Sequence, residues 1–172
     1  MAIELLEIYD ENRNKTGRIV ERGNSKLEPG EFFLVTEVLL INSNNKILVS
    51  KRSEEKKLYP GMWEVNGGGC RVGETSEEAL VREILEELGV KLDINKIYLL
   101  KTVRNEIRFK DIWTYRMDID ISDLKFTDKE VTAAKWVSYD EFLKMREENI
   151  LVDTSNITIE DYNKAIDLLK YE

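Results

Sequence analysis

The segment from Gly68 to Val90 constrains the fold and chemistry of this chain more than any other part of the sequence. It follows the spacing Gly-X5-Glu-X7-Arg-Glu-U-X-Glu-Glu-X-Gly-U, in which U is a bulky aliphatic residue. The fixed positions are Gly68, Glu74, Arg82, Glu83, Ile84, Glu86, Glu87, Gly89 and Val90. A match at so many spaced positions is specific, so we expect the segment to form one functional unit.

The middle of this segment predicts a helix. Thr75 and Glu78 are spaced as a capping box, which places the start of the helix near Ser76. Gly89 supplies the residue beyond its end. With about 100° of rotation per residue, the helix gathers three carboxylates on one arc, those of Glu83, Glu86 and Glu87. A neighbouring arc is aliphatic and contains Val81, Ile84 and Leu88. We expect the aliphatic arc to pack on a sheet while the acidic ridge faces outward.

The acidic ridge indicates a metal site. Like charges at this spacing destabilise an isolated helix by roughly 0.2–0.5 kcal/mol per pair, which a bound cation would offset. Carboxylate oxygens are the ligands that Mg²⁺ and Mn²⁺ prefer. Glutamate-rich helices are often only solvated faces. The run Gly67, Gly68 and Gly69 in front of the helix favours the metal reading, because glycines let a metal-bound diphosphate approach the backbone closely.

The spaced segment at residues 68–90 is a complete Nudix box, and the chain resembles the Nudix hydrolase superfamily. The resemblance implies an α/β/α sandwich, with a mixed β-sheet between helices, over about residues 30–148. An N-terminal β-hairpin and a C-terminal helix would then be additions to one domain spanning residues 1–172. Asn66 departs from the family pattern, which more usually has a proline before the glycines.

The resemblance also implies roles for individual residues. Glu83, Glu86 and Glu87 would bind the metal, together with the backbone carbonyl of Gly67. Glu74 and Arg82 would form an ion pair that orients these ligands. The alternative for that pair is an exposed salt bridge that contributes about 0–1 kcal/mol.

The implied reaction is hydrolysis of a diphosphate linkage in a nucleoside diphosphate joined to another group X, with a divalent metal and a carboxylate general base. The base lies within the motif in some family members and in a later loop in others, where Glu130 is the candidate. The alternative is that Glu130 is only a solvated loop residue.

Several residues are candidates for contact with a small-molecule diphosphate substrate. They are Arg52, Lys56, Trp63, Gly68 and Gly69. The two cations could equally be surface charges, and the indole of Trp63 could equally belong to the core.

A second resemblance comes from residues 50–63 and points to the branch of the superfamily that contains isopentenyl diphosphate isomerase. That enzyme carries a catalytic cysteine and a metal-binding histidine after the tryptophan, where this chain has Gly68 and Gly69. The intact box favours hydrolysis over isomerisation. A third alternative is a non-catalytic Nudix module that binds a nucleotide.

Periodicity and turn residues predict the remaining elements. The expected strands are residues 5–9, 18–22, 32–41, 47–50, 92–103, 112–121 and 134–137. Ser138 and Glu141 are spaced to cap a helix, and Thr158 opens a terminal helix.

Composition excludes several classes of function. The net charge of −8 and pI of about 4.9 leave no basic surface for nucleic acid. The chain has no histidine, so imidazole ligands and Ser-His or Cys-His nucleophiles are excluded.

One cysteine, Cys70, rules out an internal disulfide and suits a reducing cytoplasm. Neither a signal peptide nor a membrane-spanning run is evident, so we expect a cytoplasmic protein with no membrane partner. The sequence leaves monomer and homodimer open.

Overall fold

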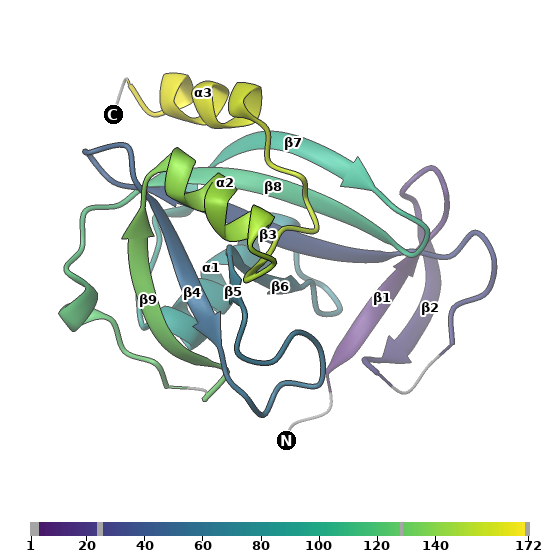
Figure 1. The fold of residues 1–172 in the computed structure, drawn as a ribbon. Helices are drawn as coiled ribbons and strands as arrows, with labels where there is room; N and C mark the ends of the chain where they lie inside the picture. Colours follow the sequence, from purple (N-terminus) through teal and green to yellow (C-terminus); the bar gives the residue numbers. More distant parts are fainter. Residues whose placement is uncertain (1–3, 24–25, 128, 171–172) are drawn as a thin grey trace.

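The computed structural model of the chain describes residues 4–23, 26–127 and 129–170. Its architecture is a mixed β-sheet with helices on both faces and a two-stranded hairpin at the N-terminal side (Figure 1). The predicted α/β/α arrangement is therefore confirmed. The helices are α1 (Ser76–Leu88), α2 (Tyr139–Glu147) and α3 (Ile159–Leu168), with short 3₁₀ turns η1 (Ile94–Lys96) and η2 (Ile121–Asp123).

The described residues form ten strands in two sheets. They are β1 (Leu5–Tyr9), β2 (Lys15–Glu21), β3 (Phe33–Ile41), β4 (Ile47–Arg52), β5 (Trp63–Glu64), β6 (Asn66–Gly69), β7 (Tyr98–Arg104), β8 (Arg108–Arg116), β9 (Val131–Val137) and β10 (Leu151–Val152). β1 and β2 make the predicted N-terminal hairpin. In the larger sheet the order is β10-β5-β4-β3-β8-β7, with β6 paired to β3 and β9 paired to β4. β3 runs parallel to β8 and antiparallel to β6, so the sheet is mixed.

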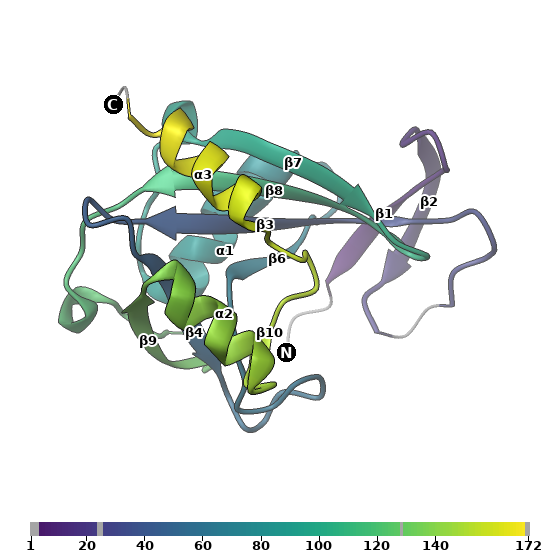
Figure 2. The same cartoon turned by 45° about the horizontal axis from the view of Figure 1, so that its top comes forward.

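The two faces of the sheet bury separate hydrophobic clusters. On one face, α1 contributes the side chains of Leu80, Ile84 and Leu88. On the other face, α2 and α3 contribute Phe142, Met145 and Ala165, among others. Figure 2 shows α2 and α3 on the same side of the sheet, with α1 behind it. The predicted packing of the aliphatic arc of α1 on the sheet is confirmed, since Ile84 and Leu88 have no exposed surface.

β3 and β4 separate soon after their connecting turn. The turn is built on Asn42, whose side-chain carbonyl accepts hydrogen bonds from the backbone N–H of Asn44 at 3.0 Å and of Lys46 at 2.9 Å. Among the described residues, Ile41 and Ile47 are the one pair that the two strands form with each other. β6 then pairs with β3 while β5 and β9 pair with β4. The asparagine turn was predicted, but the hairpin that it joins is open. The glycine strand β6 lies in that opening.

Several predicted strands have different bounds in the structure, and the differences are largest for 92–103 and 112–121, where β7 spans 98–104 and β8 spans 108–116. Leu92 packs in the hydrophobic cluster between α1 and the sheet, and Asp93 caps η1. The strand β7 therefore begins only at Tyr98. The predicted polar connection 104–111 is a tight turn. The side chain of Asn105 accepts from the backbone N–H of Ile107 and Arg108, at 3.1 and 2.9 Å, and β8 starts at once. No helix formed by the described residues has the length and apolar character that a bilayer crossing requires.

Candidate active site

The helix α1 is fixed at both ends by the residues that predicted it. The side chain of Thr75 accepts a hydrogen bond from the backbone N–H of Glu78 at 3.2 Å. The Glu78 carboxylate accepts from the Thr75 backbone N–H at 2.9 Å, which completes the capping box. Gly89 ends the helix in the left-handed conformation, with φ of 71°. The two caps therefore fix the ends of the helix that carries the carboxylates.

The three glutamates differ in burial, and the predicted outward-facing ridge is wrong for two of them. Glu83 and Glu87 are only 8% and 5% exposed, whereas the side chain of Glu86 is 40% exposed. Burial raises the pKa of Glu83 above its ordinary value, although Arg82 partly opposes this shift. Glu83 is buried because the glycine strand β6 comes close to this side of the helix, with Gly68 against the Glu83 carboxyl group.

The glycines of β6 have little space for side chains. A Cβ at Gly68 would lie within 3.0 Å of the Glu83 carboxyl group. A Cβ at Gly67 would clash with the backbone of Thr36 on the neighbouring strand. A Cβ at Gly69 would make ordinary contact, 3.5 Å from the side chain of Leu6. The packing around β6 thus requires residues without side chains at positions 67 and 68 but not at position 69.

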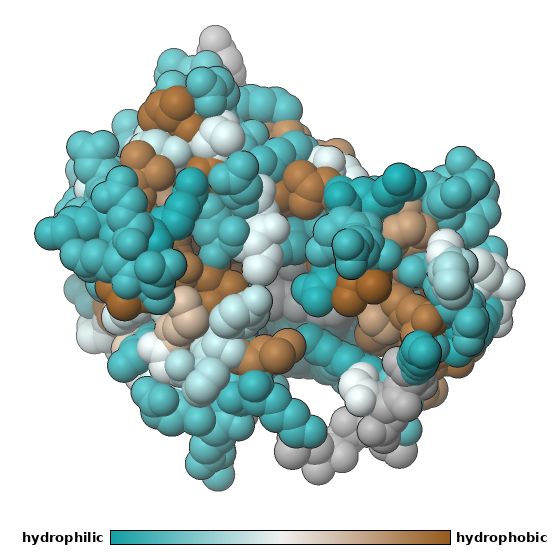
Figure 3. Space-filling view, turned by 45° about the vertical axis from the view of Figure 1, so that its right-hand side comes forward, coloured by the Kyte–Doolittle hydropathy of each residue, from teal (hydrophilic) through white to brown (hydrophobic). Residues whose placement is uncertain are grey.

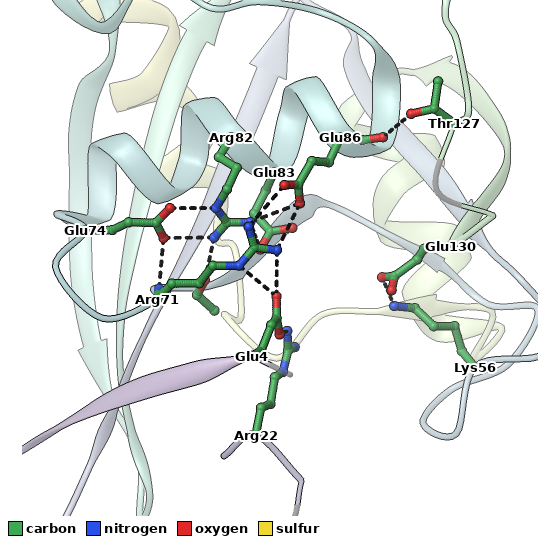
Figure 4. Close-up of polar contacts among 11 residues, drawn as sticks. Glu4, Arg22, Lys56, Arg71, Glu74, Arg82, Glu83, Glu86, Thr127 and Glu130 are labelled. Atoms are coloured by element: carbon green, nitrogen blue, oxygen red, sulfur yellow. Dashed lines mark hydrogen bonds and ion pairs between the residues drawn. The ribbon is translucent and has the colours of Figure 1, made fainter. Parts of the chain in front are cut away.

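Arg82 connects the helix, the loop before it and the strand β6. Its guanidinium donates to the two oxygens of Glu74 at 2.6 and 2.9 Å, and to the backbone carbonyl of Gly69 at 2.9 Å. It also donates to Glu83 at 2.9 Å and to Glu86 at 3.1 Å. Burial would raise the pKa of Glu74, but the hydrogen bonds from Arg82 and from the Arg71 backbone lower it. Arg82 and Glu74 do form an ion pair, and Arg82 contacts two of the three glutamates directly (Figure 4).

Sequence reasoning missed a second arginine at this site. Arg71 donates to Glu86 at 3.1 and 3.3 Å, and to Glu4 at 3.0 and 3.2 Å (Figure 4). Arg22, directly after β2, donates to the other oxygen of Glu4 at 2.7 Å. Arg71 occupies an unspecified position of the spaced motif, and Glu4 and Arg22 lie far from it in the sequence. Only the proximity of a cation to the acidic segment could have indicated Arg71.

The donor set of the site fits a hard divalent cation. The side chains on α1 and the backbone carbonyls of β6 offer oxygen ligands only, and Gly68 leaves the Glu83 carboxyl group uncovered by a side chain. Within residues 4–23, 26–127 and 129–170, no three such carboxylates are already gathered around one point where an ion could bind. Glu83 and Glu86 are instead turned toward arginines. A cation would have to compete with these ion pairs.

Glu130, the predicted loop candidate for the general base, forms an ion pair with Lys56 (Figure 4). The side chain of Glu130 is 47% exposed. The backbone carbonyl of Glu130 accepts from the N–H of Ser53 at 2.8 Å, so the loops that carry the two residues are joined. The structure thus brings two sequence candidates, Lys56 and Glu130, to one place.

A cavity of about 160 Å³ opens beside the glycine strand. Its lining includes Gly67 and Gly68, the ion pair Arg52–Glu64, and Arg22. Figure 3 shows a hollow on this side of the molecule, bordered by hydrophilic and hydrophobic residues. Arg52 also donates to the backbone carbonyl of Leu58 at 2.8 Å, so its guanidinium is held in the wall.

Trp63 and Cys70 lie outside this cavity. The ring of Trp63 is partly buried and packs against the hydrophobic cluster to which α2 and α3 contribute. The ammonium of Lys135 lies 4.3 Å from the centroid of this ring. Cys70 is 4% exposed. Asn66, which stands at the usual proline position, is 1% exposed and pairs with Val38 of β3. Its side-chain amide has no hydrogen-bond partner among the described residues.

Comparison with known proteins decides the family. The NUDIX domain family matches residues 32–153, which is more than half of the chain. The chain belongs to the Nudix hydrolase family.

Individual relatives agree with this Nudix assignment. An uncharacterized Nudix hydrolase of Listeria monocytogenes is 34% identical over 145 residues, covering 84% of this chain and 85% of that protein. The nucleoside triphosphatase NudI of an Enterobacter species is 42% identical over 71 residues, which cover 41% of this chain and 50% of that protein. The crystal structure of DR0079 from Deinococcus radiodurans superposes with a TM-score of 0.75 at 22% identity, covering 98% of this chain and 100% of that one. The structural match extends the likeness in fold beyond the family segment to the N-terminal hairpin and α3.

Proposed function

We propose that this Nudix hydrolase cleaves a diphosphate linkage in a nucleoside diphosphate joined to another group X, using Mg²⁺ or Mn²⁺. The observation that carries the proposal is the contact between β6 and α1. There Gly68 lies against the Glu83 carboxyl group, and a side chain at position 68 would cover that group. The three successive glycines of β6, beside the helix that carries the three carboxylates, leave room for a metal and a phosphate chain together.

Glu83, Glu86 and Glu87 would hold the metal, with the backbone carbonyl of Gly67 as a further ligand. When bound, the metal supplies charge neutralisation at the phosphate oxygens and lowers the pKa of water. Glu86 is the most exposed of the three carboxylates and would have to leave Arg71 to act as a ligand. Arg82, with Glu74 behind it, would keep Glu83 oriented.

Glu130 is our candidate for the general base. Its carboxylate projects from the loop before β9, and the ion pair with Lys56 orients it. A glutamate of the motif is the alternative base. The two assignments differ in what Glu130→Gln does: it removes most of the turnover with little change in KM if Glu130 is the base, and leaves turnover intact if it is not.

The cavity beside Gly67 and Gly68 would accept the part of the substrate that extends from the diphosphate. Arg52 would act as part of its wall, since its guanidinium is already bonded to Glu64 and to a loop carbonyl. The ammonium of Lys135 lies over the ring of Trp63, so a substrate that stacked on that face would have to displace it. Lys56 and Gly69 would border the site rather than line the cavity. The cytoplasmic location and the oligomeric state stay predictions from the sequence.

A substrate panel tests the proposal. The protein is incubated with Mg²⁺ and nucleoside diphosphate sugars, dinucleotides, ADP-ribose, nucleoside triphosphates and isopentenyl diphosphate, in isotopically labelled water. Nucleoside triphosphates are included because the partial relative NudI is named a nucleoside triphosphatase. Mass spectrometry then identifies the products and the phosphorus that was attacked. We expect hydrolysis by the wild-type protein and none by Glu86→Gln.

Other outcomes would refute hydrolysis. Saturable nucleotide binding without turnover would indicate a non-catalytic Nudix module. A shift of the double bond in isopentenyl diphosphate, with the diphosphate intact, would indicate the isomerase-like alternative.

A further inference from the structure

The N-terminal hairpin lies outside the residues that match the family, yet it is joined to the Nudix box. Leu6 of β1 forms an isolated β-bridge with Arg71. The backbone N–H of Val72 donates to the carbonyl of Leu5 at 3.0 Å. The hairpin is therefore hydrogen-bonded to the loop between β6 and α1, where the phosphate chain of a substrate is expected.

Glu4, just before β1, holds two arginines at this junction. One carboxylate oxygen accepts from Arg71 at 3.0 and 3.2 Å, and the other accepts from Arg22 at 2.7 Å. The backbone N–H of Arg22 also donates to the carbonyl of Glu4 at 2.9 Å. Figure 4 shows both guanidinium groups close to Glu4 and on the side of Glu86 and Glu83 that faces away from the helix axis. The side chains of Arg71 and Arg22 are 36% and 51% exposed, so an incoming ligand can reach them.

Both arginines face the predicted path of the substrate. Arg71 contacts Glu86 directly, and Arg22 lines the cavity together with Gly67 and Gly68. Burial alone would lower the pKa of Arg22, but the Glu4 carboxylate raises it, with contributions from Glu83 and Glu130. Arg22 is thus within the electrostatic reach of both the motif and the candidate base.

The negative charge of the protein explains why a phosphate-binding site would need these two arginines. The chain has a net charge of −8, and three glutamates of α1 border the site, so a phosphate chain would be repelled without local positive charge. Guanidinium groups bind phosphate oxygens in a bidentate manner. If a metal takes Glu86, Arg71 loses one carboxylate partner and gains free donors for a phosphate.

We propose that Arg22 and Arg71 bind the phosphate groups of the substrate and that Glu4 positions them. The N-terminal hairpin is then a working part of the active site. This inference rests on the proposed function, because it concerns the same substrate. The competing explanation for Arg71 is that it only neutralises Glu86 when metal is absent.

Calorimetric binding of methylenediphosphonate, a diphosphate analogue that cannot be hydrolysed, tests the proposal in the presence of saturating Mg²⁺. We expect Arg22→Ala and Arg71→Ala each to weaken binding about tenfold, the loss typical of hydrogen bonds to charged groups. Arg18→Ala is the matched control, because Arg18 lies on β2, four residues before Arg22, but pairs with Glu31. Its affinity should equal that of the wild-type protein. Unchanged affinity in both test variants would overturn the proposal.

Glutamine variants at positions 22 and 71 repeat the measurement if an alanine variant unfolds. For Arg71, a purely neutralising role predicts unchanged affinity for the analogue and equal or tighter binding of Mg²⁺ alone. The analogue titration and the substrate panel are independent. A wild-type protein that hydrolyses its substrate while both variants bind the analogue normally would refute this inference and leave the proposed function standing.

A positioning role for Glu4 is tested by non-additivity. Glu4→Ala should weaken binding of the analogue several-fold in the wild-type background, because the two guanidinium groups lose their common anchor. It should have no further effect when Arg22 and Arg71 are both replaced by alanine. An equal loss in both backgrounds would mean that Glu4 acts on the fold rather than through the arginines.

Discussion

At Gly68, both the packing of β6 on α1 and the proposed metal site require a residue without a side chain. An added methyl group would lie within 3.0 Å of the Glu83 carboxyl group, which is the end of a side chain and can move. We therefore expect Gly68→Ala to fold but to displace Glu83, weakening Mg²⁺ binding about tenfold or more. Gly69→Ala is the matched control, because its methyl group would make only ordinary contact. Calorimetry with Mg²⁺ compares the two variants, and equal affinities would contradict the placement of Glu83 as a ligand.

Gly67 differs from Gly68 in what a side chain would meet. There the obstacle is the backbone of Thr36 and Glu37, which cannot move without opening the pairing of β3 and β6. Gly67→Ala should consequently lower the free energy of unfolding, with a cost of about 1–3 kcal/mol typical of overpacking. Urea denaturation measures this cost. If Gly67→Ala were as stable as Gly69→Ala, the close approach of the two strands would be wrong.

Cys70 is the residue for which a chemical role is least expected. Burial raises the pKa of its thiol to about 12, and the residue is 4% exposed. At pH 8 the thiol should therefore resist alkylation by iodoacetamide in the folded protein and react fully in urea. Because the chain has one cysteine, mass spectrometry reads the result without ambiguity. Rapid modification under native conditions would show that the thiol is accessible.

Among the elements, the helices were predicted more accurately than the strands, because their signals are local. In the part of the chain that the structure describes, α1, α2 and α3 each begin with a capping box that the sequence contains, at Thr75, Ser138 and Thr158. Strand bounds depend on partners that are distant in the sequence. Leu92 looked like the start of a strand but packs against α1, and Asn105 closes a turn tighter than expected. The opening of the sheet between β3 and β4, into which β6 fits, has no local signal.

The same distinction applies to the candidate site. The ion pair of Glu74 with Arg82 was predicted from a contiguous motif, which also supplies the three glutamates that we propose as metal ligands. The burial of Glu83 was missed because it depends on how closely β6 packs on the helix. Glu4 and Arg22 were missed because only the docking of the hairpin brings them to the motif. Local spacing therefore indicated the chemistry, while tertiary contacts determine which charges surround it.

The capping box of α1 should contribute to stability more than to metal affinity. Replacing Thr75 by alanine removes the hydrogen bond to the Glu78 backbone and should cost about 1 kcal/mol of unfolding free energy. Ser138→Ala, which removes the same bond on α2, is the control and should cost a similar amount. Neither should change Mg²⁺ affinity by more than about twofold, since fraying is confined to the first turn of a helix and Glu83 lies beyond it. Urea denaturation and calorimetry measure the two quantities. Loss of Mg²⁺ binding in Thr75→Ala alone would mean that the first turn orients the ligands.

At the scale of the whole molecule, ion pairs at two separate places are among the contacts that join the hairpin to the domain. One is the junction of Glu4 with Arg22 and Arg71 described above. The other is at the hairpin turn, where Arg13 forms a bidentate ion pair with Asp111 of β8. Asp111 is 3% exposed and also accepts from the Thr102 hydroxyl at 2.7 Å. If the hairpin carries a phosphate-binding arginine, its attachment to β8 supports function as well as stability.

The Arg13–Asp111 pair makes a pH-dependent prediction. Burial would raise the pKa of Asp111, but hydrogen bonds from Arg13, Ser76 and Thr102 lower it below its ordinary 3.8. The unfolded chain therefore binds a proton at this carboxylate more readily than the folded chain does. The stabilisation is present above about pH 4 and is lost as the pH falls through the lower folded value.

We accordingly expect Arg13→Ala to reduce the free energy of unfolding by about 2 kcal/mol at pH 7, less than for a fully buried pair because Arg13 is 36% exposed. The difference between wild type and Arg13→Ala should shrink when urea denaturation is repeated near pH 3, because the unfolded chain takes up a proton at Asp111 there and the folded ion pair opposes that uptake. Asp111→Asn separates charge from shape, since it keeps the size of the side chain but does not titrate. Arg13→Ala should have a much smaller effect in that background at either pH. A cost of Arg13→Ala that stayed the same at both pH values would mean that the hairpin is held by packing rather than by this ion pair.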